Sequence, residues 1–564
     1  MKRIFQIFCV IGVVALLAGC EMDHYRSDTM TSAQLKDDPA SAVYTTDGNY
    51  SMFKDTQEYR GTEDSGLTYQ KMWFHMAEMR GDNVNLSGRT TSPIYNSACY
   101  NDDPTLKHGK FFWWIAYKII FSANTIIESL PEGVDAANDH LLGENYFLRA
   151  ISHLNLSCLF SRQYSHGRDN KGIVLRTSTD CSITERATVG EVYDQIVSDL
   201  QKAAELMKNG SRRGDAGYAS YEAARGLLTR VYLYREEWDK VIELANEMIG
   251  ADPDGKLDPD VANYFINARN SKETLWCIAN TATDTRERSS LGSMYFSPDG
   301  TGGTGWGECY ASDPLLDLFE RNPEDKRYAA YFSLYGQKND GLKMVTWPVP
   351  AGSNLNYENC VAMNVARAAS GKYEFDYSGK HYVVEERPVY NYTEYYIQYE
   401  GKEQRCYVRE NTDAMTGIRN SYPQFYCSKF AWQDGDPNLS SPVMIRWAEV
   451  ILNRAEAYAM MGNEAAALTD VNVIRRRAGI PEITGQSDMA MCGYTEVIDV
   501  VNDERRLELC YEAHRPFDVY RQKRSMDRRF AGVHPWEVVS YDDPRILFRI
   551  PFDEISVSGI EQNP

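Results

Sequence analysis

The closest match to a cofactor motif is the run Gly-Thr-Gly-Gly-Thr-Gly at residues 300–305, which has the spacing G-x-G-x-x-G. In a dinucleotide-binding protein this turn lies between a strand and a helix of one βαβ unit. Here Trp306 follows directly, and the next helix start is predicted only near Asp313. No Lys-Ser/Thr pair completes a phosphate-binding loop. We therefore interpret the run as a flexible loop that presents Trp306 and Tyr310.

Other catalytic or metal-binding patterns find no support in the chain. The nine histidines form no H-E-x-x-H, and the cysteines form no C-x-x-C. A glycosidase needs two carboxylates across a sugar site, but 80 acidic residues identify no particular pair. The sequence therefore predicts no enzyme, no cofactor and no metal site. Cys158 and Cys510 lie in apolar helical patterns and are predicted to be buried free thiols.

Side chains suited to ligand binding fall in two loop regions, residues 81–103 and 295–310. Glycines let a backbone approach a ligand and let an aromatic ring project from it. Trp306 is the first choice as a stacking platform, and the open alternative is that it only anchors its own loop. The predicted ligand-binding residues are Trp306, Tyr295, Tyr100, Tyr310, Asp82 and Asn83.

The N-terminus carries the pattern of a lipoprotein signal. Met1-Lys2-Arg3 precedes an apolar run that ends in Leu17-Ala18-Gly19-Cys20, and the run is too short to span a bilayer. The pattern predicts a signal peptide at residues 1–19 and lipidation of Cys20, which becomes the mature N-terminus. The alternative is an ordinary secretory signal with an incidental cysteine. The protein is expected to be tethered to a membrane outside the cytoplasm.

Charge and composition narrow the class of ligand. Removal of Lys2 and Arg3 with the signal takes the formal net charge from −20 to −22, so nucleic acid is not an expected partner. Aromatic residues make up 12% of the chain, with 38 Tyr and 10 Trp. An acidic, tyrosine-rich extracellular protein favours ligands that stack on rings and form many hydrogen bonds. Carbohydrate fits that description first and peptide second.

Hydrophobic periodicity predicts a mainly helical chain with a different middle section. A capping box at Thr188–Glu191 predicts a helix start. Residues 280–442 are rich in Gly, Asn, Pro and Tyr, and a β-hairpin is predicted across Glu400-Gly401. The predicted regions are 20–279, 280–442 and 443–564. Helices are expected over 111–130, 141–160, 188–207, 220–234, 238–249, 443–461, 464–477, 495–511 and 515–523.

Two helical hairpins are internally similar at an offset of 224 residues. Leu228, Arg230, Tyr234 and Leu244 correspond to Leu452, Arg454, Tyr458 and Leu468. Hairpins of about 34 residues with small residues at the helix crossing indicate tetratricopeptide repeats, and stacking of neighbours would bury their apolar faces. The alternative is a set of generic amphipathic helices.

A charged segment near the C-terminus, residues 502–523, could be mistaken for a site. It contains opposite charges three residues apart at Glu512–Arg515, Arg515–Asp518 and Asp518–Arg521. Arginine forks suit bridging between helices, so we interpret the segment as a packed ion-pair network.

Several segments, in chain order, resemble the SusD/RagB family of outer-membrane nutrient-binding lipoproteins. RAEAYAMMGNEAAALTDVNVIRRRAGI at 454–480 looks like the family's helical hairpin. NDERRLELCYEAHRPFDVYRQKR at 502–524 resembles its E-R-R-x-E-L motif, and RIPFDEISVSGIEQNP at 549–564 is similar to its ending. The departures are small: Ala513 stands where Gly is usual, and Pro516 where an aromatic is common.

The resemblance implies a mainly α fold, with four tetratricopeptide-like hairpins and a loop-rich insertion carrying short β-hairpins. It implies a surface-exposed lipoprotein that binds oligosaccharide and delivers it to a SusC-like TonB-dependent outer-membrane transporter. The acidic Glu21-Met22-Asp23 resembles the surface-export signal of Bacteroidetes lipoproteins. An oligopeptide-binding RagB-type lid and a repeat scaffold without a small-molecule ligand stay open as alternatives.

Overall fold

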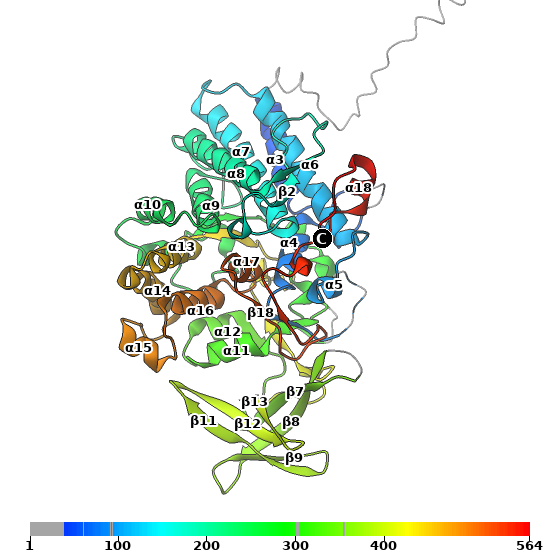
Figure 1. Cartoon of the computed structure of the whole chain (residues 1–564), viewed down its shortest axis with the longest axis vertical. Coiled ribbons are helices and arrows are strands. Elements are labelled where there is room, and N and C mark those ends of the chain that lie inside the picture. The colour runs from blue at the N-terminus through cyan, green and yellow to red at the C-terminus, as the bar shows by residue number, and fades with distance from the viewer. Residues whose placement is uncertain are drawn as a thin grey trace, which may run out of the picture.

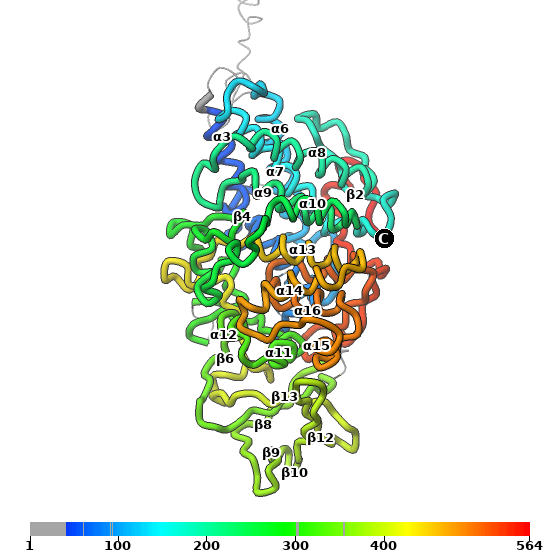
Figure 2. Tube along the Cα trace, turned by 90° about the vertical axis from the view of Figure 1, so that its left-hand side faces the viewer, coloured from blue at the N-terminus to red at the C-terminus, as the bar shows by residue number. Residues whose placement is uncertain are grey.

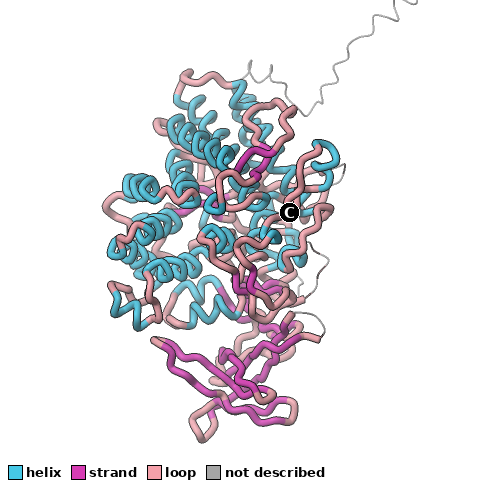
Figure 3. Tube along the Cα trace, in the orientation of Figure 1, coloured by secondary structure: helices cyan, strands magenta, loops and turns pink. Residues whose placement is uncertain are grey.

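The computed structural model describes residues 39–59, 61, 63–88, 90, 92, 94–300, 304–352 and 356–564. The predicted signal peptide and Cys20 lie outside the described residues. The protein is mainly α-helical, as predicted, and a β-sheet extends from one end of the helical body (Figures 1 and 3). Within the described ranges, every helix is too short or too polar to cross a membrane.

The first half of the body is helical, and its helices from α6 onward follow the predicted periodicity, whereas α3, α4 and α5 were not predicted. The capping box is confirmed, since Thr188 accepts from the Glu191 N–H and Glu191 accepts from the Thr188 N–H. The helix predicted from residue 141 begins earlier, at Ala136, because Asp135 caps the N–H groups of Ala137 and Asn138. These helices are α3 (Pro39–Ser51), α4 (Tyr69–Glu78), α5 (Ile94–Ala98), α6 (Lys107–Ser129), α7 (Ala136–Phe160), α8 (Val189–Met207), α9 (Tyr221–Tyr234) and α10 (Trp238–Ile249).

In the second half of the chain α11, α13, α14, α16 and α17 follow the prediction, with one correction, whereas the short helices α12, α15 and α18 were not predicted. The helix predicted to begin at Val443 begins at Trp447, and Val443–Arg446 instead forms strand β17, paired with β4 (Thr274–Cys277). A short, fully buried apolar run cannot be assigned to helix or strand by periodicity alone. The helices are α11 (Asp313–Glu320), α12 (Lys326–Tyr331), α13 (Trp447–Met460), α14 (Glu464–Ala478), α15 (Gln486–Met491), α16 (Val497–Leu509), α17 (Arg515–Arg521) and α18 (Phe552–Ser558).

The two hairpins with internal similarity pack directly on each other. α9 and α10 both contact α13. Thr229 and Asn453, which are 224 residues apart, are joined by a 3.0 Å hydrogen bond from the Asn453 amide. The assignment of these hairpins to tetratricopeptide repeats stays a prediction.

Leu468 belongs to a small apolar core between α13, α14 and α16. It is 4% exposed and clusters with Ala455, Val471 and Val500, whereas its predicted companion Tyr458 is only half-buried. We expect Leu468→Ala to lower the free energy of unfolding by about 2–5 kcal/mol, because it removes transfer free energy and leaves a cavity. Denaturant titration measures the change. Thr469→Ala on the exposed face is the control, and an unmoved midpoint for Leu468→Ala would contradict this packing.

The middle section contains one large antiparallel sheet. The predicted hairpin is confirmed: β12 and β13 flank Glu400 and Gly401, whose φ values of 50° and 78° suit a two-residue turn. Short hairpins were predicted for this section, but the structure has a larger sheet. Seven strands pair in the order β10-β9-β8-β7-β13-β12-β11. They are β7 (Lys343–Pro350), β8 (Tyr357–Arg367), β9 (Tyr373–Tyr377), β10 (Lys380–Val383), β11 (Glu385–Val389), β12 (Tyr392–Tyr399) and β13 (Lys402–Glu410).

The sheet has its own apolar core, separate from that of the body. Trp347 is fully buried at its centre, 5.5 Å from Phe375 and surrounded by Ile397 and Cys406. Two perpendicular views place the sheet beyond α11 and α12, at the end of the molecule opposite α3 (Figures 1 and 2). The sheet is therefore a projecting unit attached to the helical body.

Shorter two-stranded pairs connect loops within and around the body. They are β1 (Val84–Leu86) with β5 (Cys309–Ala311), β2 (Lys171–Val174) with β3 (Arg186–Thr188), β6 (Phe332–Leu334) with β16 (Phe425–Cys427), β14 (Ile418–Arg419) with β15 (Tyr422–Pro423), and β18 (Met526–Asp527) with β19 (Val538–Val539).

The charged C-terminal segment forms a buried ion-pair network, as predicted. Glu508 accepts from Arg327, Arg446 and Arg477. Of the three predicted pairs at i, i+3, Asp518–Arg521 forms at 2.7 Å. Glu512 instead pairs with Lys429 and Arg446, and Arg515 pairs with Asp82. Tertiary partners outcompete the local ones because the segment is buried between helices. Cys158 and Cys510 are buried free thiols, as predicted.

Candidate functional site

Five of the six predicted ligand-binding residues lie in the interior. Asp82 and Tyr100 are 5% and 4% exposed, and the other three are completely buried. A ligand at the surface cannot reach side chains that are covered by other elements. The buried set is Tyr295, Tyr310, Tyr100, Asp82 and Asn83.

The three buried tyrosines pack in cores. Tyr295 lies edge-on to His75 and Tyr511, with ring centroids 5.4 and 5.2 Å apart. The Tyr100 hydroxyl lies 2.5 Å from that of Tyr520. Tyr310 lies on β5, and burial raises its pKa to about 12. Loop composition predicted that these rings are available, but the loops fold inward over the body.

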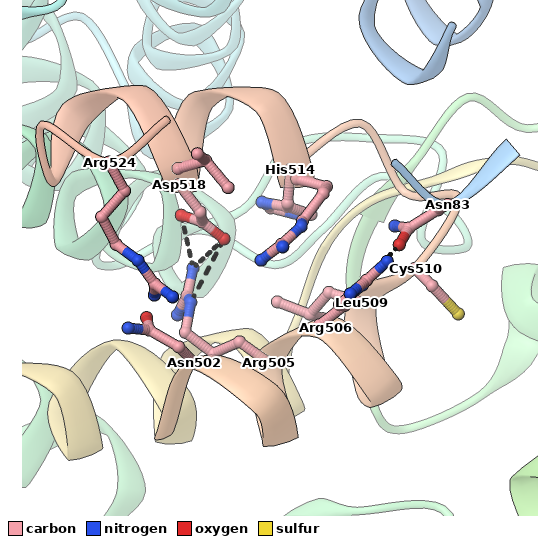
Figure 4. A pocket seen from close by; sticks show the side chains of 11 residues that line it. Asn83, Asn502, Arg505, Arg506, Leu509, Cys510, His514, Asp518 and Arg524 are labelled. Atoms are coloured by element: carbon pink, nitrogen blue, oxygen red, sulfur yellow. Dashed lines mark hydrogen bonds and ion pairs between the residues drawn. The ribbon is translucent and has the colours of Figure 1, made fainter. Parts of the chain in front are cut away.

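Asp82 and Asn83 hold the C-terminal helices in place, and Figure 4 shows Asn83 beside Arg506. Asp82 accepts from Arg515 Nε at 2.8 Å, and Asn83 Oδ1 accepts from Arg506 Nε at 2.8 Å. Burial alone would raise the pKa of Asp82, but the charges of Arg506 and Arg515 outweigh it and hold that pKa well below its ordinary value. The neighbouring void of about 10 Å³ is about the size needed for one water. This cluster is a structural ion-pair site.

Trp306 differs from the other five because its side chain is accessible. It is 42% exposed, and the Arg288 guanidinium lies 3.9 Å from its ring centroid. Arg419 donates to the Trp306 carbonyl at 2.8 Å and also pairs with Glu308. The backbone of the loop is therefore held from within while the indole stays at the surface.

A second exposed tryptophan, Trp432, was not predicted. It is 39% exposed, and its ring packs edge-on against buried Phe296 at 5.6 Å. Its φ of 70° is unusual for a bulky residue and is often found where function requires strain. Asp434-Gly435, two residues further along, is a sequence signal for a turn, and it could have indicated that Trp432 lies on a loop.

The loops that carry the two tryptophans touch each other. The Asn438 amide donates to the Thr304 carbonyl at 2.9 Å. Gly305 packs so closely on the Phe296 carbonyl that a Cβ there would lie 2.3 Å from that oxygen. Phe296 therefore links the two loops. The Arg288 guanidinium lies over one face of the Trp306 indole, so a flat apolar ligand face can stack on the other face of that ring and on Trp432, with the guanidinium available to donate hydrogen bonds. These residues form the candidate site.

Two long stretches of the chain match models of known protein families. Residues 272–560 match the model of the SusD family, and residues 42–233 match a model described as "Starch-binding associating with outer membrane". Two SusD-like proteins of Formosa agariphila are 23% and 22% identical to the chain. The first alignment covers 79% of this chain and 78% of the relative, and the second covers 85% and 87%.

Solved structures share the fold. A SusD superfamily protein from Bacteroides thetaiotaomicron superposes with a TM-score of 0.65 at 21% identity, covering 93% of this chain and 99% of that one. A SusD-like carbohydrate binding protein from Bacteroides vulgatus gives a TM-score of 0.64 at 18% identity, covering 92% and 96%. The helical body, its C-terminal motifs and a family match over more than half of the chain agree, and the chain belongs to the SusD/RagB family.

Proposed function

We propose that the protein is a non-enzymatic glycan-binding lipoprotein of the outer membrane. The observation that carries the proposal is the pair of exposed indoles, Trp306 and Trp432, on loops joined through Phe296. An indole face matches the apolar face of a pyranose ring, and the nearby arginine can donate to sugar hydroxyls. The description of one matching family as starch-binding, and the name of one structural neighbour as carbohydrate binding, support this class of ligand.

The proposed role is capture and delivery. Bound oligosaccharide would pass to a SusC-like TonB-dependent transporter, while the lipid on Cys20 keeps the protein at the cell-surface side of the outer membrane. The family description that mentions association with the outer membrane supports this location. The formal net charge of −22 after signal removal argues against nucleic acid as the cargo.

Trp306→Ala tests the proposed site. We expect the affinity for a neutral oligosaccharide to fall by about 1 kcal/mol or more, because the variant loses a stacking surface. Isothermal titration calorimetry measures the affinity, and thermal unfolding should show a native stability. Tyr44→Ala, which removes a 73% exposed ring from α3, is the matched control and should bind like the natural protein. Unchanged affinity in a stable Trp306→Ala variant would remove Trp306 from the site.

A second experiment on the same protein and oligosaccharide separates binding from catalysis. Oligosaccharide incubated with the purified protein should be recovered at its original length by chromatography. Cleavage that persisted in repeated preparations would contradict a pure binding role.

A further inference from the structure

A cavity of about 740 Å³ lies between the helical body and the projecting sheet. One wall comes from α11, α12 and the strand after them, and the other comes from β12 and β13. Its volume falls within the range of about 300–1,000 Å³ that is typical of small-molecule sites. It shares no lining residue with the loops of Trp306 and Trp432. The cavity is therefore a separate feature of the fold.

The sheet turns a patterned polar face toward this cavity. Tyr407 and Arg409 line the cavity. Arg405 lies two residues before Tyr407 on the same face, paired with Tyr396 beside the cavity. The Arg405 guanidinium lies 5.6 Å from the Tyr396 ring and 5.7 Å from the Tyr407 ring. The Arg409 guanidinium lies 4.6 Å from Tyr407. Tyrosine rings and guanidinium groups thus alternate along the face, while the opposite face carries the apolar core around Trp347.

The helical body completes the pattern. Arg321, at the end of α11, lies over the Tyr392 ring at 4.7 Å. Arg409 pairs with Glu320 at 2.7 Å, and Arg405 pairs with Asp317 at 2.8 Å. These pairs join the sheet to α11 across the cavity and fix the positions of the charged groups. The polar lining is thereby preorganised, which lowers the ordering cost of binding.

The chemistry of the lining points to an uncharged ligand with many hydroxyl groups. Three cations line the cavity, and each has a carboxylate partner: Arg409 with Glu320, Lys343 with Glu410, and Arg321 with Asp503. An ionic ligand would therefore have to displace an existing pair. Carboxylate oxygens and guanidinium N–H groups can still hydrogen-bond sugar hydroxyls. The half-buried rings of Tyr392 and Tyr407 offer stacking surfaces.

An extended peptide fits less well. Recognition of a peptide backbone by a sheet requires a strand with an unpaired edge. β12 is paired on one side with β11 and on the other with β13, and β13 is paired with β12 and β7. Both strands of the large sheet that border the cavity therefore lack a free edge. Among the described residues only the three-residue β6 in the opposite wall, which pairs with β16 alone, has a side without a strand partner.

We infer that this cavity is a second binding site for neutral oligosaccharide. The inference rests on the proposed glycan-binding function and adds a site to it. One molecule of the protein would then hold two short oligosaccharides, or one long oligosaccharide at two places.

Two variants test the cavity, one by filling it and one by removing part of its wall. Ala329→Trp adds bulk at an exposed α12 position that lines the cavity, and Tyr392→Ala removes a ring from the sheet wall. Calorimetry with neutral tetrasaccharides of glucose, mannose, xylose and galactose gives the affinity and the stoichiometry. We expect the natural protein to bind two molecules of its preferred sugar and Ala329→Trp to bind one. Tyr392→Ala should weaken the second site by about fivefold, as the loss of one ring contact would.

The controls distinguish failure of the cavity from failure of the proposed function. Tyr44→Ala should keep both sites, and each variant should unfold at the temperature of the natural protein. A stoichiometry of one that Trp306→Ala abolishes and Ala329→Trp leaves unchanged would overturn the cavity alone. No binding of any sugar to the natural protein would overturn both proposals. Binding of a mixture of hexapeptides that Ala329→Trp abolishes would overturn the assignment of the cavity to sugar.

Discussion

Glu508→Ala is expected to destabilise the protein by about 3–5 kcal/mol, because it removes one partner of a buried ion-pair network. Glu508 is completely buried and accepts from Arg446 Nη1 at 2.5 Å and from Arg327 Nη1 at 3.1 Å, in addition to Arg477. Without its carboxylate, guanidinium groups that are also buried lose a counter-charge. Denaturant unfolding measures the change. Glu561→Ala, which breaks an exposed pair with Lys171, should change stability by less than about 0.5 kcal/mol.

The same residue makes stability depend on pH. Burial alone would raise the pKa of Glu508, but the three arginines outweigh it and hold that pKa well below its ordinary value. The unfolded state therefore takes up a proton at higher pH than the folded state. The stabilisation is present above the unfolded pKa of about 4.3 and is lost as pH falls through the folded pKa. The pKa of Glu512, which faces Arg446 and Lys429, is lowered in the same way.

A Glu508→Ala variant that lost no stability would show that the network is energetically neutral.

Cys20→Ala is expected to abolish membrane attachment of the mature protein. The apolar run that precedes Cys20 is too short to span a bilayer, so stable attachment depends on acyl chains. The variant should lose incorporation of labelled fatty acid and should leave the membrane fraction or remain at precursor size. Fractionation and lipid labelling in cells measure both effects.

Another cysteine, within the predicted signal peptide, provides the control for this experiment. Cys9 lies in the apolar run, and Cys9→Ala should keep labelling and location unchanged. Undiminished lipid labelling of Cys20→Ala would contradict the assignment of the anchor.

Most of the longer helices could be predicted because their signals are local. Thr188 and Glu191 cap α8 within one turn, and Gly479 ends α14 in the left-handed conformation. The seven-stranded sheet could not be predicted to the same extent. Its strand order depends on pairing between distant segments, such as Lys343 with Val365 and Glu410. Those pairings leave no periodic signal at short range.

The candidate site could be predicted only in part, for a related reason. Glycine-rich sequence predicts a loop, but it does not predict which side of the loop faces the core. Trp306 and Tyr295 lie eleven residues apart in one such loop region, yet the first is 42% exposed and the second is completely buried. Trp432 escaped prediction because its exposure depends on its packing against Phe296, which is 136 residues away.

The two ends of the projecting sheet have a consequence for how this protein can change over evolution. The chain enters the sheet at Lys343 and leaves it at Glu410, and these two residues are direct partners on neighbouring strands. A segment whose ends meet can be lengthened, exchanged or deleted with little effect on the chain at its borders, as in domain insertion. Since the sheet also has its own apolar core, selection can remodel residues 343–410 as a cassette. The surface of this segment could then change while the helical body keeps its sequence.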